Sequence, residues 1–174
     1  MHHLLASRRI SQMEESEYLL TLGKLVANLH SLEFSLRAFL LKNFESREPK
    51  VNLTNIIAGD EVPLNSFTNY DTLGRVIDRY NEVVQPVYPS CCVDKTVVEV
   101  RDMIAHGRIA GKTLTPPYEL VKFGKPNKSS MVPVEQVVTL DSHWLSSNVN
   151  LVLDQIHKVV EASNQLGQNI MEDA

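Results

Sequence analysis

The chain has 174 residues and a formal net charge of −4, and 43% of its residues are hydrophobic and 22% charged. This length and composition are typical of one globular domain, so we expect residues 1–174 to form a single domain. No segment has the ~18 unbroken apolar residues of a membrane span, and no apolar stretch of a secretory signal follows Arg8-Arg9. We therefore expect a cytoplasmic protein with no membrane partner.

The first predicted helix runs from about residue 16 to residue 44, after a loose lead-in over residues 1–12. Its apolar residues are Tyr18, Leu22, Leu25, Leu29, Leu32, Leu36 and Phe39. They recur at alternating steps of four and three, which indicates a long helix with a broad buried face.

This helix has a second stripe, in which apolar residues recur every seven positions. Glu33 occupies one position of this stripe in place of an apolar residue. A buried carboxylate without a partner is costly, so Glu33 needs one. Arg37, one turn further on, would form a common i,i+4 pair, and this alternative is favoured. In the other alternative, Glu33 faces the arginine–histidine helix described below and orients Arg101 or His106.

Residues 45–70 are predicted to be a long connection with one short turn around Leu53–Ile57. A second helix is expected to follow it, with Asp71 as the N-cap and the last turn at Val84. The residues expected to face inward are Leu73, Ile77, Tyr80 and Val84.

The third predicted helix runs from Val93 to His106, and Gly107 occupies its C-cap position. Val93, Val97, Val100 and Ile104 step by four, three and four along one apolar face. Arg101 and His106 are five residues apart in the sequence. At about 100° per residue, their side chains leave the helix in directions that differ by roughly 140°. The two side chains therefore share one target only if the site wraps the helix end or a second chain supplies the other half.

The composition of residues 108–140 differs from that of the helical segments before them. It predicts a β-hairpin, inserted at about residues 110–140 between the last two helices. Tyr118–Phe123 and Val132–Leu140 are β-rich, and the turn-forming cluster Gly124–Asn127 lies between them. Asp141 or Ser142 is then expected to cap a final helix that ends near Leu166. The fold class predicted from these elements is a mainly α helical bundle with a small hairpin.

Several common kinds of site are excluded by their missing motifs. The chain has no P-loop, no dinucleotide-binding glycine fingerprint and no nucleophile elbow. Its histidines and its adjacent Cys91 and Cys92 show no metal-ligand spacing. We therefore expect no cofactor and no metal.

Charge is distributed unevenly along the chain. Residues 101–130 carry six cations against two acids, and residues 131–174 carry one cation against six acids. The positive zone begins at the arginine–histidine helix, so Arg108 and Lys112 are candidate contacts for RNA phosphates. On charge alone, a basic solvated loop explains this zone equally well.

Arg101 and His106 form the one distinctive pair of the sequence. A histidine can take a proton from a ribose 2′-hydroxyl or give one to a leaving oxygen. An arginine fork can bind the scissile phosphate, and Asp102 could orient the guanidinium or the imidazole. The pair could thus cleave RNA without a metal, although spacing alone is also compatible with ordinary surface contacts.

The segment Arg101–Gly107 resembles the signature of the HEPN superfamily (higher eukaryote and prokaryote nucleotide-binding domains). That signature is an arginine, a polar residue, a spacer and a histidine, on the third long helix of an up-and-down four-helix bundle. The run Leu32–Arg37 is similar to a "Leu-Glu-x-x-Leu-Arg" run that precedes the motif in some members. The resemblance implies a four-helix bundle with the hairpin inserted between the last two helices.

The resemblance also implies a homodimer in which two motif helices face each other and build a composite ribonuclease site. Arg101 would bind phosphate, His106 would act as acid and base, and Asp102 would be the polar motif residue. The function expected first is a metal-independent endoribonuclease, such as a toxin or phage-defence effector. The alternative is a non-catalytic module that binds a nucleotide or pairs with a nucleotidyltransferase or an antitoxin.

Overall fold

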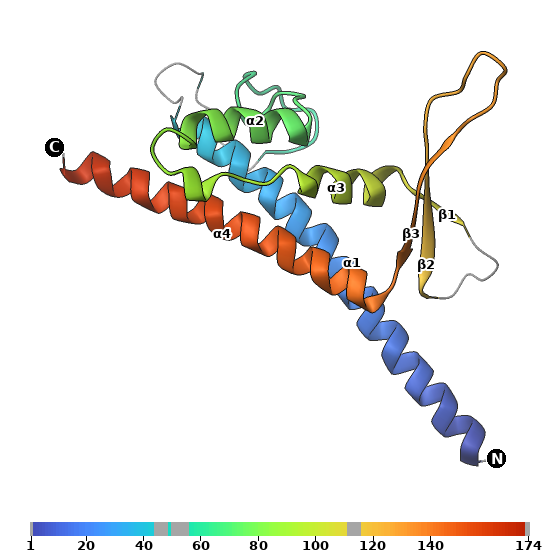
Figure 1. The fold of residues 1–174 in the computed structure, drawn as a ribbon. Helices are drawn as coiled ribbons and strands as arrows, with labels where there is room; N and C mark the ends of the chain where they lie inside the picture. The colour runs from blue at the N-terminus through green and yellow to red at the C-terminus, as the bar shows by residue number, and fades with distance from the viewer. Residues whose placement is uncertain (1, 44–48, 50–55, 111–115, 173–174) are drawn as a thin grey trace. The chain divides into compact units, whose positions relative to one another are not determined.

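The computed structural model describes residues 2–43, 49, 56–110 and 116–172; for residues 2–14 and 167–172 it describes the helical backbone only (Figure 1). The elements in these ranges are α1 (His2–Asn43), α2 (Leu73–Val84), the 3-10 helix η1 (Pro89–Cys91), α3 (Thr96–His106), β1 (Arg108–Ala110), β2 (Tyr118–Phe123), β3 (Val134–Leu140) and α4 (Ser142–Glu172). The protein is therefore mainly helical with one small sheet, which confirms the mainly α prediction. None of the described helices has an apolar stretch long enough to cross a bilayer.

The chain divides into two compact units, and α1 and α4 each contribute to both. The first unit contains Met1–Leu29 and Thr96–Val152, and the second contains His30–Lys95 and Leu153–Ala174. The sheet and α3 belong to the first unit. The connection after α1, α2 and η1 belong to the second.

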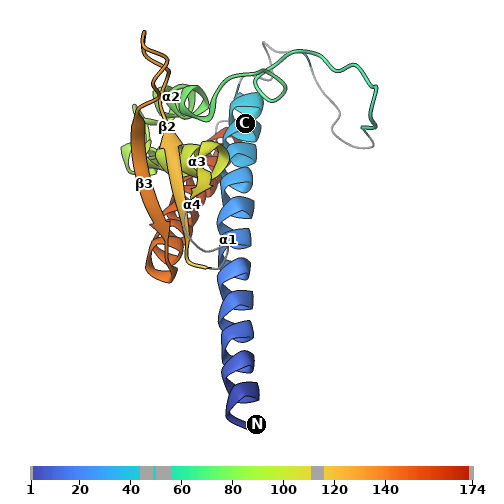
Figure 2. The ribbon, with the colours of Figure 1, turned by 90° about the vertical axis from the view of Figure 1, so that its right-hand side faces the viewer.

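The sheet of the first unit is antiparallel with the strand order β1-β2-β3, and Figure 2 shows β2 and β3 side by side. Met103 of α3, Leu120 of β2 and Leu140 at the end of β3 form its buried core. Partly buried residues packed against this core are Tyr18, Leu22, Ile104, Val138 and Trp144. One face of the sheet thus rests on helices. The sequence predicted a two-stranded hairpin, whereas the structure has a three-stranded antiparallel sheet in which β2 pairs with β3 and also with β1.

The second unit has its own core, in which α1 packs against α2. The four residues of α2 that the sequence placed inward are all buried, and Phe39 of α1 meets Tyr80 edge-to-face with ring centroids 4.8 Å apart. The Tyr80 hydroxyl donates to the Cys91 carbonyl at 3.2 Å. Burial raises the pKa of Tyr80, so the hydroxyl stays a donor at neutral pH.

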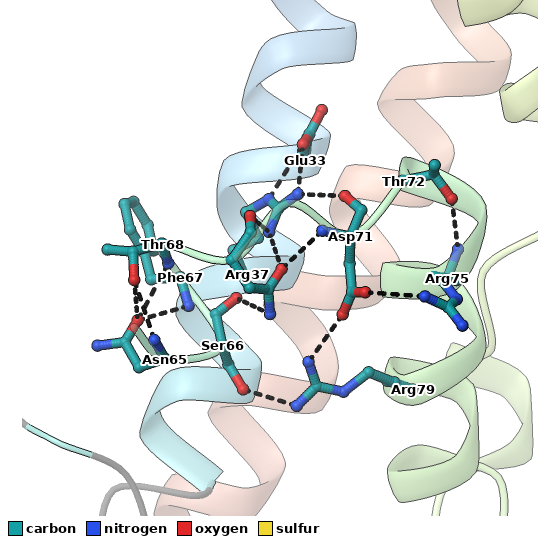
Figure 3. Close-up of polar contacts among 11 residues, drawn as sticks. Glu33, Arg37, Asn65, Ser66, Phe67, Thr68, Asp71, Thr72, Arg75 and Arg79 are labelled. Carbon is teal, nitrogen blue, oxygen red and sulfur yellow. Dashed lines mark hydrogen bonds and ion pairs between the residues drawn. The ribbon is translucent and has the colours of Figure 1, made fainter. Parts of the chain in front are cut away.

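Arg37 is the centre of a polar network that joins α1 to the segment before α2 (Figure 3). Its Nε and Nη2 donate to Glu33 Oε1 at 3.0 and 2.9 Å, so the favoured i,i+4 pair is present. Nη1 donates to Asn69 Oδ1 at 2.9 Å, and Nη2 donates to the Asp71 carbonyl at 2.7 Å. Because the guanidinium is nearly buried, these contacts compensate the loss of its hydration.

The predicted boundaries of three helices were wrong in ways that have physical causes. The backbone of α1 is helical from His2, so residues 2–12 belong to the helix and are not a loose lead-in. The carboxylate of Asp71 pairs with Arg75 and Arg79, and the N-cap of α2 is Thr72, whose hydroxyl accepts from the Arg75 amide at 3.5 Å. Helix α4 extends beyond Leu166 to Glu172, while its expected cap is confirmed, since Asp141 Oδ1 accepts from the Trp144 amide at 2.7 Å.

Helix α3 begins at Thr96, three residues later than predicted. The side chain of Asn81 accepts from the Val93 amide at 2.8 Å and donates to the Val93 carbonyl at 2.9 Å. The Asp94 amide donates to Gln155 Oε1 at 2.9 Å. Side-chain amides thus take the backbone groups that a longer helix would use, a competition that apolar spacing does not reveal.

Two further expectations concern the connections. Most of the short turn expected around Leu53–Ile57 lies outside the described residues. Strand β3 begins at Val134 and not at Val132, because Pro133 has no N–H for a ladder and its carbonyl accepts from the Gly124 amide at 2.9 Å.

Gly107→Ala is expected to destabilise the protein. A Cβ at this residue would meet the Met103 carbonyl oxygen and lie 3.2 Å from the Leu120 Cβ. Overpacking of this kind costs about 1–3 kcal/mol, so urea denaturation should show a free energy of unfolding lowered by that amount. Gly23→Ala on α1 is the control, since no atom lies within 4 Å of its added Cβ and the change stabilises a helix by about 0.5–1 kcal/mol. Equal stabilities of the two variants would contradict this packing.

Arg37→Ala should lower the free energy of unfolding by about 1.5–3 kcal/mol, because it leaves the Glu33 carboxylate without its charged donor. Arg75→Ala removes the same residue type from another i,i+4 pair, but that side chain is 77% exposed and lies 3.6 Å from Asp71. An exposed pair of this kind contributes about 0–1 kcal/mol. Thermal unfolding of both variants checks the difference, and a smaller loss for Arg37→Ala than for Arg75→Ala would refute the network's role.

Candidate functional site

The last turns of α3 carry the three motif residues Arg101, Asp102 and His106, and the structure brings all three together within one chain. Arg101 Nη1 lies 3.0 Å from Asp102 Oδ1 and 3.3 Å from His106 Nε2. The guanidinium therefore reaches around the helix end to the histidine. This corresponds to the first of the two arrangements that the sequence allowed, a site that wraps the end of the helix.

The contact with Arg101 is made by Nε2 of His106. A guanidinium has only donors, so in a hydrogen bond between these two groups Nη1 donates and the lone pair of Nε2 accepts. A neutral imidazole with an accepting Nε2 is the form that can remove a proton from a substrate hydroxyl.

The guanidinium of Arg101 has its remaining donors available for a ligand. The two N–H groups of Nη1 serve Asp102 and His106. Over the described part of the chain, Nε and Nη2 of Arg101 make no hydrogen bond. These two nitrogens form one edge of the planar fork, and such an edge binds two oxygens of a phosphate. Asp102 thus orients the arginine without occupying this edge.

The three motif side chains are accessible to a macromolecular substrate. The Arg101 and Asp102 side chains are 39% and 32% exposed, and His106 is exposed. An ion pair with this exposure contributes little to stability. The arrangement is an open anion-binding position beside a proton acceptor.

The chain continues from the motif directly into the sheet, as Figure 1 shows, and this places Arg108 on β1 next to the helix end. The Arg108 guanidinium lies over the Phe123 ring, 5.4 Å from its centroid. Arg108 is exposed, as expected of a phosphate contact. Lys112, the other candidate for this role, lies outside the described residues.

Glu33 belongs to the second unit, and its Oε1 is occupied by Arg37. The alternative that it orients Arg101 or His106 stays a prediction. Phe123 is the residue at this end of the sheet that sequence reasoning missed. Its signal is weak, since an aromatic residue that closes a strand is usually interpreted as packing.

A cavity of about 690 Å³ in the first unit does not belong to the motif. The acidic residues Glu15, Glu17 and Asp141 contribute to its lining, together with Tyr18 and the Pro116-Pro117 segment. Three carboxylates disfavour a phosphate ligand, so this cavity is a poor candidate for the RNA site. Across the described ranges, no three His, Cys, Asp or Glu side chains gather as metal ligands.

Comparison with known proteins adds no relative to this geometry. No protein-family model, curated protein or solved structure matches the chain. The resemblance to the HEPN superfamily is therefore carried by Arg101–Gly107 and by the run Leu32–Arg37.

Proposed function

We propose that the protein is a metal-independent endoribonuclease of HEPN type that cleaves RNA through Arg101 and His106. The observation that carries the proposal is the contact between Arg101 Nη1 and His106 Nε2, which leaves the Nε–Nη2 edge open for a phosphate. The exposure of the motif and the basic segment that follows it are consistent with an RNA substrate.

The proposed reaction begins when Arg101 binds two non-bridging oxygens of the scissile phosphate. The ribose 2′-hydroxyl replaces Arg101 Nη1 at His106 Nε2, whose one lone pair cannot accept from both groups. Nε2 then removes the hydroxyl proton, and the 2′-oxygen attacks phosphorus. The bond from phosphorus to the 5′-oxygen breaks, and that oxygen takes a proton from an imidazolium. The products are a 2′,3′-cyclic phosphate and a 5′-hydroxyl, while Arg101 stabilises the charge that develops on the phosphoryl oxygens.

In the proposed assembly, the chain forms an up-and-down four-helix bundle with the β-sheet inserted between α3 and α4, and two copies pair through their α3 helices. A second His106 across the two-fold axis would supply the imidazolium, so that each copy provides either base or acid. This assembly suits a cytoplasmic toxin or phage-defence effector that a partner protein holds inactive.

A non-catalytic module is the second candidate, and the ion pair between Arg101 and Asp102 at 3.0 Å favours it. If the arginine serves Asp102 alone, the motif would hold the helix end and contact a nucleotide, a nucleotidyltransferase or an antitoxin. The sequence pI of about 5.9 is also low for a general RNA-binding protein.

The first experiment is cleavage of a mixed-sequence RNA in the presence of EDTA. Wild-type protein should produce 2′,3′-cyclic phosphate ends, and His106→Ala should lower the rate about 10²- to 10⁴-fold because it removes the proton acceptor. Arg101→Lys should also be slow, because lysine keeps the charge but loses the two-pronged edge.

His157→Ala is the matched control, since it removes another exposed histidine from α4, away from the motif in sequence. It should cleave at the wild-type rate, and circular dichroism should show equal helicity for all variants. Cleavage that persists in His106→Ala, or absent cleavage in wild type at high enzyme concentration, would reject the ribonuclease and favour the module.

A further inference from the structure

The face of the sheet opposite the Met103–Leu120 core carries two exposed side chains, Arg108 and Phe123, beside the buried Val121, and the Arg108 Cζ lies over the Phe123 ring. Arg108 pairs with Val121 in the register of β1 and β2, and Val121 pairs with Val137 of β3. Paired residues point to the same face, so this face is opposite the one that carries Leu120. A register shift lies between Lys122 and Phe123, and the 5.4 Å contact with Arg108 establishes that the Phe123 ring lies with this group.

The Arg108–Phe123 pair lies beside the proposed catalytic motif. Arg108 follows His106 by two residues, so their Cα atoms are at most about 7 Å apart. The strands β1 and β2 are antiparallel, so the residues that follow Val121 in β2 extend toward the start of β1. Phe123 therefore lies near the first residue of β1. The pair is therefore at the end of the sheet that adjoins the last turn of α3.

The chemistry of the pair suits an unpaired nucleobase. Proteins that bind unpaired RNA stack its bases on aromatic rings and on arginine planes. The Phe123 ring is 40% exposed, Arg108 is exposed, and the Arg108 Cζ lies 5.4 Å from the ring centroid, so a base can reach both groups. A base stacked on this pair would contact both the charged Arg108 guanidinium and the exposed Phe123 ring.

The segment that contains the sheet is positive overall, while the face that carries Arg108 also carries the carboxylate of Glu119, because Glu119 and Val121 are two residues apart on β2. In the described part of residues 108–140, four cations outnumber two carboxylates. The cations are Arg108, Lys122, Lys125 and Lys128, and the carboxylates are Glu119 and Glu135. An apolar partner protein would gain contacts with Val137, but it would have to desolvate the Arg108 guanidinium. Single-stranded RNA is therefore the occupant that the observations favour.

We propose that Arg108 and Phe123 form a stacking subsite for an unpaired base of single-stranded RNA, next to the phosphate held by Arg101. This inference rests on the proposed ribonuclease function and specifies its substrate. A base within a duplex is stacked on its neighbours and cannot lie on the Arg108 plane. The enzyme then selects unpaired segments such as loops and ends.

The test measures binding of a fluorescein-labelled oligouridylate of 12 nucleotides by fluorescence anisotropy, with EDTA present. The protein is the His106→Ala variant, so that the probe stays intact. Adding Phe123→Leu should weaken binding roughly five- to hundred-fold, as expected for the loss of one stacked base. Phe123→Trp should retain the affinity, because it keeps an aromatic plane, and Arg108→Lys should weaken binding because it removes the guanidinium plane while keeping the charge.

Two readouts separate this inference from the proposed function. If wild-type protein cleaves RNA and Phe123→Leu leaves oligouridylate affinity unchanged, the subsite is wrong and the ribonuclease stands. If Phe123→Leu weakens binding while wild-type protein does not cleave, the subsite stands and the ribonuclease is wrong.

Two other outcomes overturn the inference. One is that the His106→Ala parent does not bind the oligouridylate. The other is that Phe123→Leu changes the dimer dissociation constant in sedimentation velocity and not the RNA affinity, which would identify the face as a contact between proteins. Circular dichroism of each variant distinguishes these outcomes from misfolding. Arg108→Lys serves as a second variant, because it changes the pair while keeping the charge.

Discussion

The close approach of α3 to β2 at Gly107 is the constraint on which the candidate site depends. A Cβ at this residue would meet the Met103 carbonyl oxygen, and Leu120 packs on the same place from the sheet. The helix can therefore end and the first strand begin with a single residue between them. His106 is the last residue of the helix and Arg108 is the first residue of the strand. The imidazole of His106 and the guanidinium of Arg108 are therefore both exposed at one junction.

Arg101 divides its donors so that one end of the guanidinium is held by the protein and another edge is open. Asp102 and His106 share Nη1, which restricts the rotamers of a long and flexible side chain before any ligand arrives. Preorganised donors of this kind lower the cost of stabilising charge that develops during a reaction. Among the described side chains, His106 is the imidazole that contacts Arg101. In the proposed reaction, the second proton transfer would therefore take its imidazolium from a second copy of the chain.

Sequence pattern was sufficient to predict part of the fold. Apolar periodicity identified the buried face of α2, while β-rich composition and a turn-forming cluster identified the position of β2 and its pairing with β3. Sequence pattern missed β1, because three residues with two exposed side chains leave no pattern to recognise. It also placed the start of α3 too early, because Val93 is buried and apolar, yet its backbone groups bond to Asn81.

The sequence named the residues of the candidate site and left their geometry open between two arrangements. Motif resemblance identified Arg101, Asp102 and His106, whereas the angle of about 140° suggested that the first and last point apart. That angle describes the directions of the Cβ atoms, and the arginine side chain is long enough to cancel it. The contact between Arg108 and the Phe123 ring depends on the register of the strands, which is difficult to predict from a single sequence.

The division of the chain into two units has a consequence for how the protein can be dissected. Each unit has a core of its own, but neither is a continuous piece of the chain, because the boundaries fall within α1, before α3 and within α4. Deleting the whole of α1 or the whole of α4 would remove a helical segment from both units. Separating the units would require two cuts through helices that are continuous in the native protein. No simple truncation yields an independent domain, and the segment that carries the motif is expected to require both long helices in order to fold.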